Sequence, residues 1–133
     1  MKKLLLVLLC VPLIGLSQTQ WEMNENAANK YSETDSILTS IYNKINIEYS
    51  EDTLFIDYLT KSQEVWLKLR EVNFKLKYPE NVYVRQGSIF TLCKYNFLDE
   101  ITQDRIDFLM PWYIGDFTGS RGDVCSGSIK NIE

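Results

Sequence analysis

The sequence predicts an all-α protein, a small antiparallel bundle of three main helices followed by an irregular C-terminal tail. Three stretches carry apolar residues at steps of three and four, which is the spacing of one face of a helix. Tyr78-Pro79 follows the second stretch and Met110-Pro111 follows the third. Three amphipathic helices each need a partner for their apolar stripe, and packing them together buries all three stripes.

The first predicted helix extends from Trp21 to about Tyr49, and neither glycine nor proline interrupts it. Its apolar face consists of Ala27, Ala28, Tyr31, Leu38, Ile41, Tyr42, Ile45 and Tyr49. Ser50 is the expected N-cap of the next helix, because Glu51 and Asp52 then fall in a first turn, where the helix dipole favours negative charge.

The second predicted helix extends from Glu51 to about Lys77. Its apolar face consists of Leu54, Phe55, Tyr58, Leu59, Val65, Trp66 and Leu69. Tyr78-Pro79 ends this helix, because the residue before a proline is pushed away from helical geometry. A polar link near Glu80–Gly87 follows.

The third predicted helix extends from Ser88 to about Leu109, and Met110-Pro111 is expected to stop it. Its apolar residues are Ile89, Leu92, Cys93, Phe97, Ile101 and Phe108. Glycine then recurs among serine and aspartate, so residues 111–133 are expected to form a loop or a loosely docked arm. Its anchors on the bundle are expected to be Trp112, Tyr113, Ile114 and Phe117.

The chain opens with the features of a secretory signal peptide. Lys2-Lys3 precedes an apolar run from Leu4 to Leu16, and Gly15-Leu16-Ser17 forms a small-x-small ending. The apolar run is too short to span a bilayer. We therefore expect residues 1–17 to be removed and residues 18–110 to form a helical domain in the periplasm or outside the cell, with no membrane span.

The predicted mature domain is acidic. Loss of Lys2 and Lys3 leaves 12 of the 14 basic side chains against 18 acidic ones, a net charge of −6. Such a domain is a poor nucleic-acid binder, because phosphate contacts need clustered lysine and arginine. It is drawn instead to cationic partners. The alternative interpretation is that the charge only keeps an exported protein soluble.

Cys93 and Cys125 remain in the mature chain, in a compartment where disulfides form. A bond between them would stabilise the fold by roughly 3–4 kcal/mol. The sequence leaves open whether the two sulfurs meet.

The residue inventory argues against catalysis and against a bound metal or cofactor. The absence of histidine excludes Ser-His-Asp and Cys-His systems and histidine-containing zinc sites. Calcium-binding loops and phosphate-binding glycine loops are also missing from the sequence. Glu22, Asp35 and Glu64 are candidate acid–base residues on count alone, but carboxylates on a helix surface are usually solvated. We therefore expect no enzymatic activity, no cofactor and no metal site.

Several short motifs, taken together, resemble those of one domain family. Its Q-x-E-M-N opening is matched by Gln20, Glu22, Met23 and Asn24, and its D-x-x-L…Y step by Asp35, Leu38 and Tyr42. Its Q-x-x-W…R signature is matched by Gln63, Trp66 and Arg70. Its closing G-S-I…T-x-x-R-x-x-x-L is matched by Gly87, Ser88, Ile89, Thr102, Arg105 and Leu109. Over about Gln20 to Leu109 the chain resembles the lysozyme inhibitor LprI family.

The resemblance implies an exported helical domain that in some members inhibits lysozyme. Family members usually carry cysteines where this sequence has Asn26, Phe74 and Phe97, so the usual disulfides are absent. Burial of the two phenylalanine rings could replace that constraint, each ring contributing roughly 1.5–3 kcal/mol.

The shared residues admit a structural and a functional interpretation. In the structural one, Glu22 or Asp35 pairs with Arg70, while Trp66 and Tyr42 pack between the first two helices. In the functional one, a groove lined by Glu22, Asn24, Gln63 and Arg70 receives a loop of a partner. We favour the structural interpretation, because core-facing spacing explains these positions without a ligand.

The predicted function is that of an exported, non-enzymatic binding protein that inhibits lysozyme or a similar cationic cell-wall hydrolase. Carboxylates or a loop, supplied by Trp112–Asp116 or by Glu80–Gly87, would block the active-site cleft of the hydrolase. The alternative is a structural or assembly factor of the bacterial envelope with no hydrolase target. The sequence leaves the oligomeric state undetermined.

Overall fold

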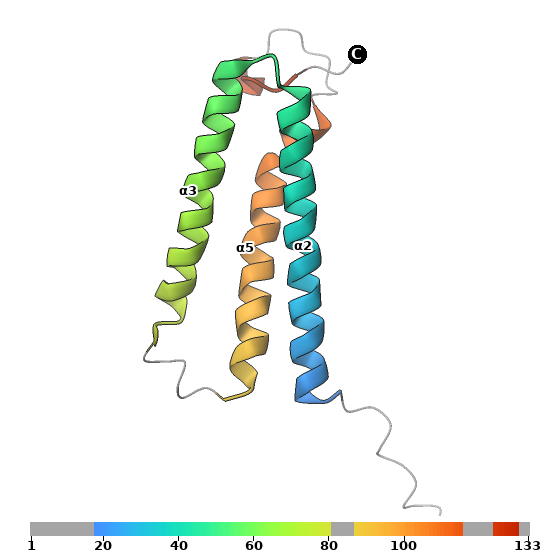
Figure 1. Cartoon of the computed structure of the whole chain (residues 1–133), viewed down its shortest axis with the longest axis vertical. Helices are drawn as coiled ribbons and strands as arrows, with labels where there is room; N and C mark the ends of the chain where they lie inside the picture. Colours follow the sequence, from blue (N-terminus) through green and yellow to red (C-terminus); the bar gives the residue numbers. More distant parts are fainter. Residues whose placement is uncertain (1–17, 81–86, 116–123, 131–133) are drawn as a thin grey trace, which may run out of the picture.

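Three long helices run up, down and up along the molecule (Figure 1). The computed structural model describes residues 18–80, 87–115 and 124–130. The helices are α2 (Gln20–Glu48), α3 (Thr53–Lys77) and α5 (Ile89–Ile114), and a short 3-10 helix, η1 (Val124–Ser126), follows. The prediction of an all-α, antiparallel three-helix bundle is confirmed.

The predicted leader, residues 1–17, lies outside the described residues. Among the helices that are described, none combines the length and the apolar character needed to cross a bilayer.

Helix α2 begins at a reciprocal capping box. The Thr19 hydroxyl accepts a hydrogen bond from the Glu22 backbone N–H at 3.2 Å, and the Glu22 carboxylate accepts one from the Thr19 N–H at 3.0 Å. This arrangement satisfies two of the N–H groups that a helix start leaves without partners. Glu22 is therefore committed to the start of its own helix.

The N-cap of α3 is Asp52 and not Ser50, which corrects the prediction. The Asp52 side chain accepts a hydrogen bond from the Phe55 N–H at 3.0 Å. The Ser50 N–H donates instead to the Ile47 carbonyl, within the turn that follows α2. The helix thus starts two residues later than expected, because the turn needs those residues to reverse the chain.

The hydrophobic core lies mainly between α2 and α5, which run parallel and pack closely along their length. Its buried residues are Leu38, Ile41, Ile45, Tyr49, Leu59, Ile106 and Leu109. Helix α3 contributes only Leu59 to this set, with Phe55 and Trp66 packed against it. Leu54, Tyr58, Val65 and Leu69, predicted to face the core, are instead exposed. The predicted apolar face of α3 is broader than the part that the other helices cover.

Helix α5 continues through Pro111 to Ile114, so the predicted stop at Met110-Pro111 is wrong. A proline inside a helix removes its own N–H bond and its ring crowds the carbonyl four residues earlier, and α5 ends within one turn of Pro111. Trp112 packs against the core, which stabilises the extra turn. Gly115, at φ 82°, ends the helix in a conformation that favours glycine, and its N–H donates to the Pro111 carbonyl.

The described part of the tail docks on the upper end of the bundle in Figure 1. The Trp112 Nε1–H donates to the Ser128 hydroxyl at 3.0 Å, and the Lys130 backbone N–H donates to the Tyr49 hydroxyl at 2.8 Å. The Lys130 ammonium also donates to the Glu48 carbonyl. Burial raises the pKa of Tyr49, against the opposing effect of the Lys130 N–H.

The disulfide that the sequence left open does not form, and Cys93 carries a free thiol. Cys93 lies near the start of α5, whereas Trp112 near its end contacts the tail that carries Cys125. The intervening helix spans about 28 Å, and a disulfide needs Cα atoms within about 7 Å.

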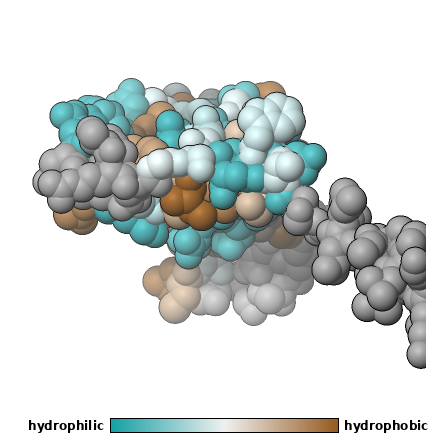
Figure 2. All heavy atoms as spheres, turned by 90° about the horizontal axis from the view of Figure 1, so that it is seen from below, coloured by the Kyte–Doolittle hydropathy of each residue, from teal (hydrophilic) through white to brown (hydrophobic). Residues whose placement is uncertain are grey.

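Aromatic packing occupies Phe74 and Phe97, two of the positions at which the resemblance implies cysteine in other members. The Phe74 and Phe97 ring centroids lie 5.5 Å and 6.1 Å from that of Tyr78, and Phe90 lies at 5.4 Å. Seen from this end of the bundle (Figure 2), hydrophobic side chains still reach the surface between hydrophilic ones. The cluster joins the end of α3 to the start of α5, and its rings are half-buried.

Asp52→Ala is expected to lower the free energy of unfolding by about 1 kcal/mol, because the Phe55 N–H loses its acceptor. Ser50→Ala, at the cap position predicted from sequence, is the matched control and should change it by less than about 0.5 kcal/mol. Urea denaturation followed by circular dichroism measures both. Equal losses in the two variants would contradict the assignment of Asp52 as the cap.

Candidate functional site

The residues that carry the family motifs meet at the centre of the bundle, around the Trp66 indole. The guanidinium carbon of Arg70 lies 4.8 Å from the ring centroid, and that of Arg105 lies 5.7 Å from it. Aromatic faces attract cations at these distances. One indole from α3 thus contacts a cation of its own helix and a cation of α5.

Arg70 connects all three helices. Its Nη1 donates to the Asp35 carboxylate of α2 at 2.6 Å and to the Thr102 hydroxyl of α5 at 3.2 Å. The Arg70 side chain is only 16% exposed, whereas that of Asp35 is 42% exposed. The pair is therefore partly shielded from water and is worth more than a fully solvated ion pair.

Arg105 is buried and is satisfied by neutral groups of α3. Its Nε donates to the Gln63 side-chain oxygen at 3.0 Å, and its Nη2 donates to the Ser62 hydroxyl at 2.9 Å. The Phe108 ring centroid lies 5.1 Å from its guanidinium carbon. Burial lowers the pKa of Arg105 from its ordinary value, and the side chain stays charged at neutral pH. The side-chain dipoles of Gln63 and Ser62 and the ring faces of Trp66 and Phe108 thus stabilise the buried positive charge of Arg105.

The structural interpretation of the motif is confirmed, and of the two carboxylates that it allowed, Asp35 is the partner of Arg70. Asp35 forms the ion pair with Arg70, while Glu22 caps α2. Trp66 and Tyr42 both pack against the core, and the Tyr42 hydroxyl lies 3.5 Å from that of Thr60 on α3.

The structure does not bring together the four residues that the functional interpretation placed in one groove, because each has a separate structural partner. Asn24 donates to the Ser88 carbonyl at 3.0 Å at the start of α5, far along the bundle from Gln63. Gln63 and Arg70 are engaged with Arg105 and Asp35. Met23, next to Asn24, is half-buried. The motif residues therefore hold the helices together.

A buried carboxylate that the motifs did not indicate lies between α2 and α5. Asp99 accepts a hydrogen bond from the Thr34 hydroxyl at 2.5 Å and forms an ion pair with Lys30 at 2.7 Å. Burial acts to raise the pKa of Asp99, but the hydrogen bonds from Lys30 and Thr34 outweigh it and lower the pKa below 3.8. Asp99 lies three residues before Thr102, so both fall on the core-facing side of α5. This spacing is the sequence signal that could have predicted a buried carboxylate.

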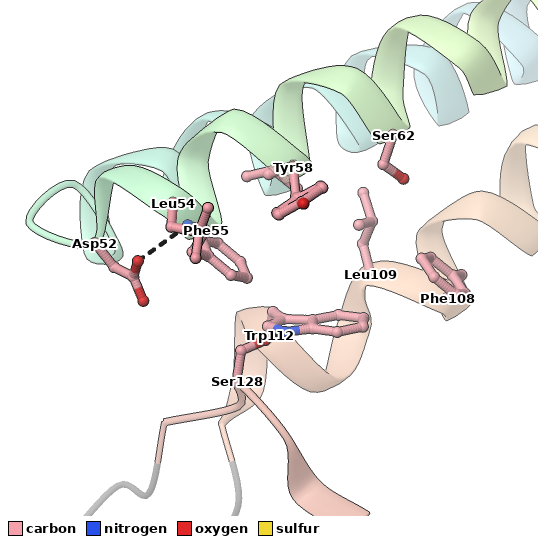
Figure 3. Close-up of a pocket in the computed structure, with 10 residues that line it drawn as sticks. Asp52, Leu54, Phe55, Tyr58, Ser62, Phe108, Leu109, Trp112 and Ser128 are labelled. Atoms are coloured by element: carbon pink, nitrogen blue, oxygen red, sulfur yellow. Dashed lines mark hydrogen bonds between the residues drawn. The ribbon is translucent and has the colours of Figure 1, made fainter.

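An open pocket of about 340 Å³ lies between the first turns of α3 and the end of α5 (Figure 3). Its walls are mainly apolar and aromatic, formed by Leu54, Phe55, Tyr58, Leu59, Phe108, Leu109 and Trp112. Asp52 is its charged lining residue, and that carboxylate already caps α3. This arrangement suits the docking of an apolar group and offers no pair of carboxylates for acid–base chemistry.

Trp112–Asp116 and Glu80–Gly87 were the two segments predicted to supply an inhibitory loop. Trp112, Tyr113 and Ile114 belong to α5 and are therefore not a loop. Residues 81–86 and 116 lie outside the described residues.

Comparison with known proteins gives one match. The family model described as lysozyme inhibitor LprI matches residues 15–109, which include every motif residue identified from the sequence. A search of curated proteins and a search of solved structures each found no match.

Arg70→Met is expected to lower the free energy of unfolding by about 1–3 kcal/mol, because it removes the link between the helices and leaves the buried Thr102 hydroxyl without its donor. Lys61→Met, which breaks the exposed pair with Asp57, is the matched control and should cost less than about 1 kcal/mol. Urea denaturation compares them. A loss for Arg70→Met no larger than the control would contradict a stabilising role for the network.

The stabilising contribution of Asp99 is expected to disappear at acidic pH. Because its pKa is lower in the folded chain than in the unfolded one, its contribution is complete above the unfolded value near 3.8 and falls as pH drops through the folded value. The difference in unfolding free energy between the wild type and Asp99→Asn should therefore shrink as pH falls from 6 to about 2. Asp57→Asn, at an exposed position, is the control. A difference independent of pH would refute the assignment.

Proposed function

This chain belongs to the lysozyme inhibitor LprI family, and we propose from that membership that it is an exported binding protein that inhibits lysozyme or a similar cationic cell-wall hydrolase. The match to the family over residues 15–109 is the observation that carries the proposal. The family description names an inhibitor, which supports a role in binding rather than in catalysis.

The placement of the carboxylates supports a binding role. Glu22 caps a helix and Asp35 holds Arg70, and neither lines the open pocket between α3 and α5. Glu64 is exposed on α3. General acid–base catalysis needs a positioned group within reach of the substrate, and the three candidates identified from the sequence do not converge.

The surface charge supports a cationic target. The net charge of −6 expected for the mature domain attracts a basic hydrolase over a range set by the Debye length, about 8 Å at physiological salt. Glu25 and Glu33 are exposed on α2, and within the described part of the chain neither is engaged by a hydrogen bond or an ion pair. Their full charge is available to steer and hold such a partner.

The test is a cell-wall lysis assay in which purified chain is titrated against lysozyme. We expect lysis to slow as the chain approaches molar equivalence and the inhibition to weaken between 50 and about 300 mM salt, because exposed charges are screened. Full lysis in the presence of a large molar excess of the chain would overturn the proposal. Salt-resistant capture of an envelope protein without any effect on lysis would favour the alternative of an envelope assembly factor.

A charge-neutralised variant tests the electrostatic part. Glu25→Gln/Glu33→Gln should raise the concentration needed for half inhibition several-fold at low salt and much less at high salt. Asn29→Gln/Asn43→Gln changes two exposed side chains on the same helix without changing charge, and should inhibit like the wild type. Equal inhibition by both variants at low salt would exclude a steering role for these acids.

A further inference from the structure

Arg105 carries a buried positive charge that no carboxylate pairs with among the described residues. Only 7% of the residue is exposed, and its hydrogen bonds go to the neutral side chains of Gln63 and Ser62. Arg70, by contrast, is paired with Asp35. Because a charged side chain is rarely buried without a partner of opposite charge, the surroundings of Arg105 would stabilise an anion that came close to it.

Ser62 separates this charge from the open pocket between α3 and α5. Its hydroxyl oxygen accepts the hydrogen bond from Arg105 Nη2 at 2.9 Å, and its side chain lines the pocket. Within the described part of the chain, the Ser62 hydroxyl donates its own proton to no other group. A hydroxyl that accepts a hydrogen bond from a cation is polarised and donates more strongly. The proton of Ser62 is therefore available to an acceptor on a ligand at this end of the pocket.

The rest of the pocket is suited to a single unbranched chain. Figure 3 shows apolar and aromatic side chains from both helices between Ser62 and Asp52. The volume of about 340 Å³ is near the lower end of the roughly 300–1,000 Å³ found for ligand sites. Leu54, Tyr58 and Phe108 are each more than half exposed, so an alkyl chain laid across them would remove apolar surface from water.

The position of Asp52 favours an anionic head at the Ser62 end of the pocket. Asp52 is the charged residue of the lining, and it lies about 15 Å from Ser62 along α3, at 1.5 Å per residue. This separation exceeds the Debye length of about 8 Å at physiological salt, so the repulsion from this exposed carboxylate is largely screened. Arg105 lies one hydrogen bond behind Ser62 and is shielded from solvent, so its attraction is screened less.

Two charged side chains that are adjacent in sequence to Ser62 and Arg105 are exposed to solvent. Lys61 is paired with Asp57 of its own helix. Asp104 does not line the pocket. Exposed charges contribute little because solvent and salt screen them. The buried charge of Arg105 therefore dominates the field at the Ser62 hydroxyl.

We propose that this pocket binds a fatty acid, whose carboxylate accepts a hydrogen bond from the Ser62 hydroxyl in the field of Arg105. The alkyl chain then lies along the apolar walls towards Leu54 and Trp112, away from the buried charge. Neither the contact at the head nor the burial of the chain involves the exposed acids of α2. The inference therefore goes beyond the proposed function and does not depend on it.

The test is a titration of the purified full chain with decanoate below its micelle concentration, followed by NMR of the nitrogen-labelled protein. The Trp112 indole lines the pocket and its resonance should shift, while that of Trp21, which is exposed at the start of α2, should not. Decanol has the same chain with a neutral head, and decylammonium has a cationic head. Decanoate should bind on the order of 10-fold more tightly than decanol, because its acceptor is charged, and decylammonium should bind more weakly than decanol.

Two pairs of variants separate the contact at the head from the burial of the chain. Ser62→Ala should weaken decanoate binding on the order of 10-fold and decanol binding much less, because only the carboxylate brings a charge to the hydroxyl. Ser62→Thr keeps the hydroxyl and should bind both ligands like the wild type. Leu54→Asp should weaken both ligands, whereas Leu76→Asp, at a similarly exposed position near the other end of α3, should weaken neither. Circular dichroism should show unchanged helix content in each variant.

The absence of a shift of the Trp112 resonance with decanoate would overturn the proposal, and so would decanol that binds as tightly as decanoate. Tighter binding of decylammonium would assign the pocket to cations through Asp52 and overturn it as well. A folded Ser62→Ala variant that binds decanoate like the wild type would have the same consequence. Because the comparison of the three ligands uses the wild type, it decides the proposal even if a variant fails to fold.

Discussion

The ion pair between Asp35 and Arg70 is the constraint on which the arrangement of the three helices depends. Helices α2 and α5 share a continuous core, whereas α3 contributes only Leu59 to the fully buried set. Apolar packing alone would let α3 shift along the other two helices. A shift of one turn would separate Arg70 from Asp35 and Arg105 from Gln63. Losing these partly buried contacts costs about 1–3 kcal/mol, so the polar network fixes the level of α3.

This role changes what the family motifs mean for function. The signature residues are occupied in holding the helices together, and Trp66 serves as the ring between two guanidinium groups. A motif of this kind identifies the fold and leaves the partner-binding surface free to differ. Glu25 and Glu33 are exposed on α2 outside this signature and remain available for binding.

The exposed acids of α2 carry negative charge, which acts at long range and is weakened by salt. Charge of this kind suits a basic partner.

The sequence by itself determined the three helices, the core-facing stripe of α2 and the family, because helical periodicity and short motifs are local properties of the chain. It narrowed the partner of Arg70 to two carboxylates. The tertiary structure decided that Asp35 is the partner, that Asp52 caps α3, that α5 continues through Pro111, and that Cys93 lies a helix length from the tail. It also decided that much of the apolar surface of α3 stays exposed. The reason is that spacing fixes the direction in which a side chain points along its own helix, while burial and pairing depend on how closely another helix approaches.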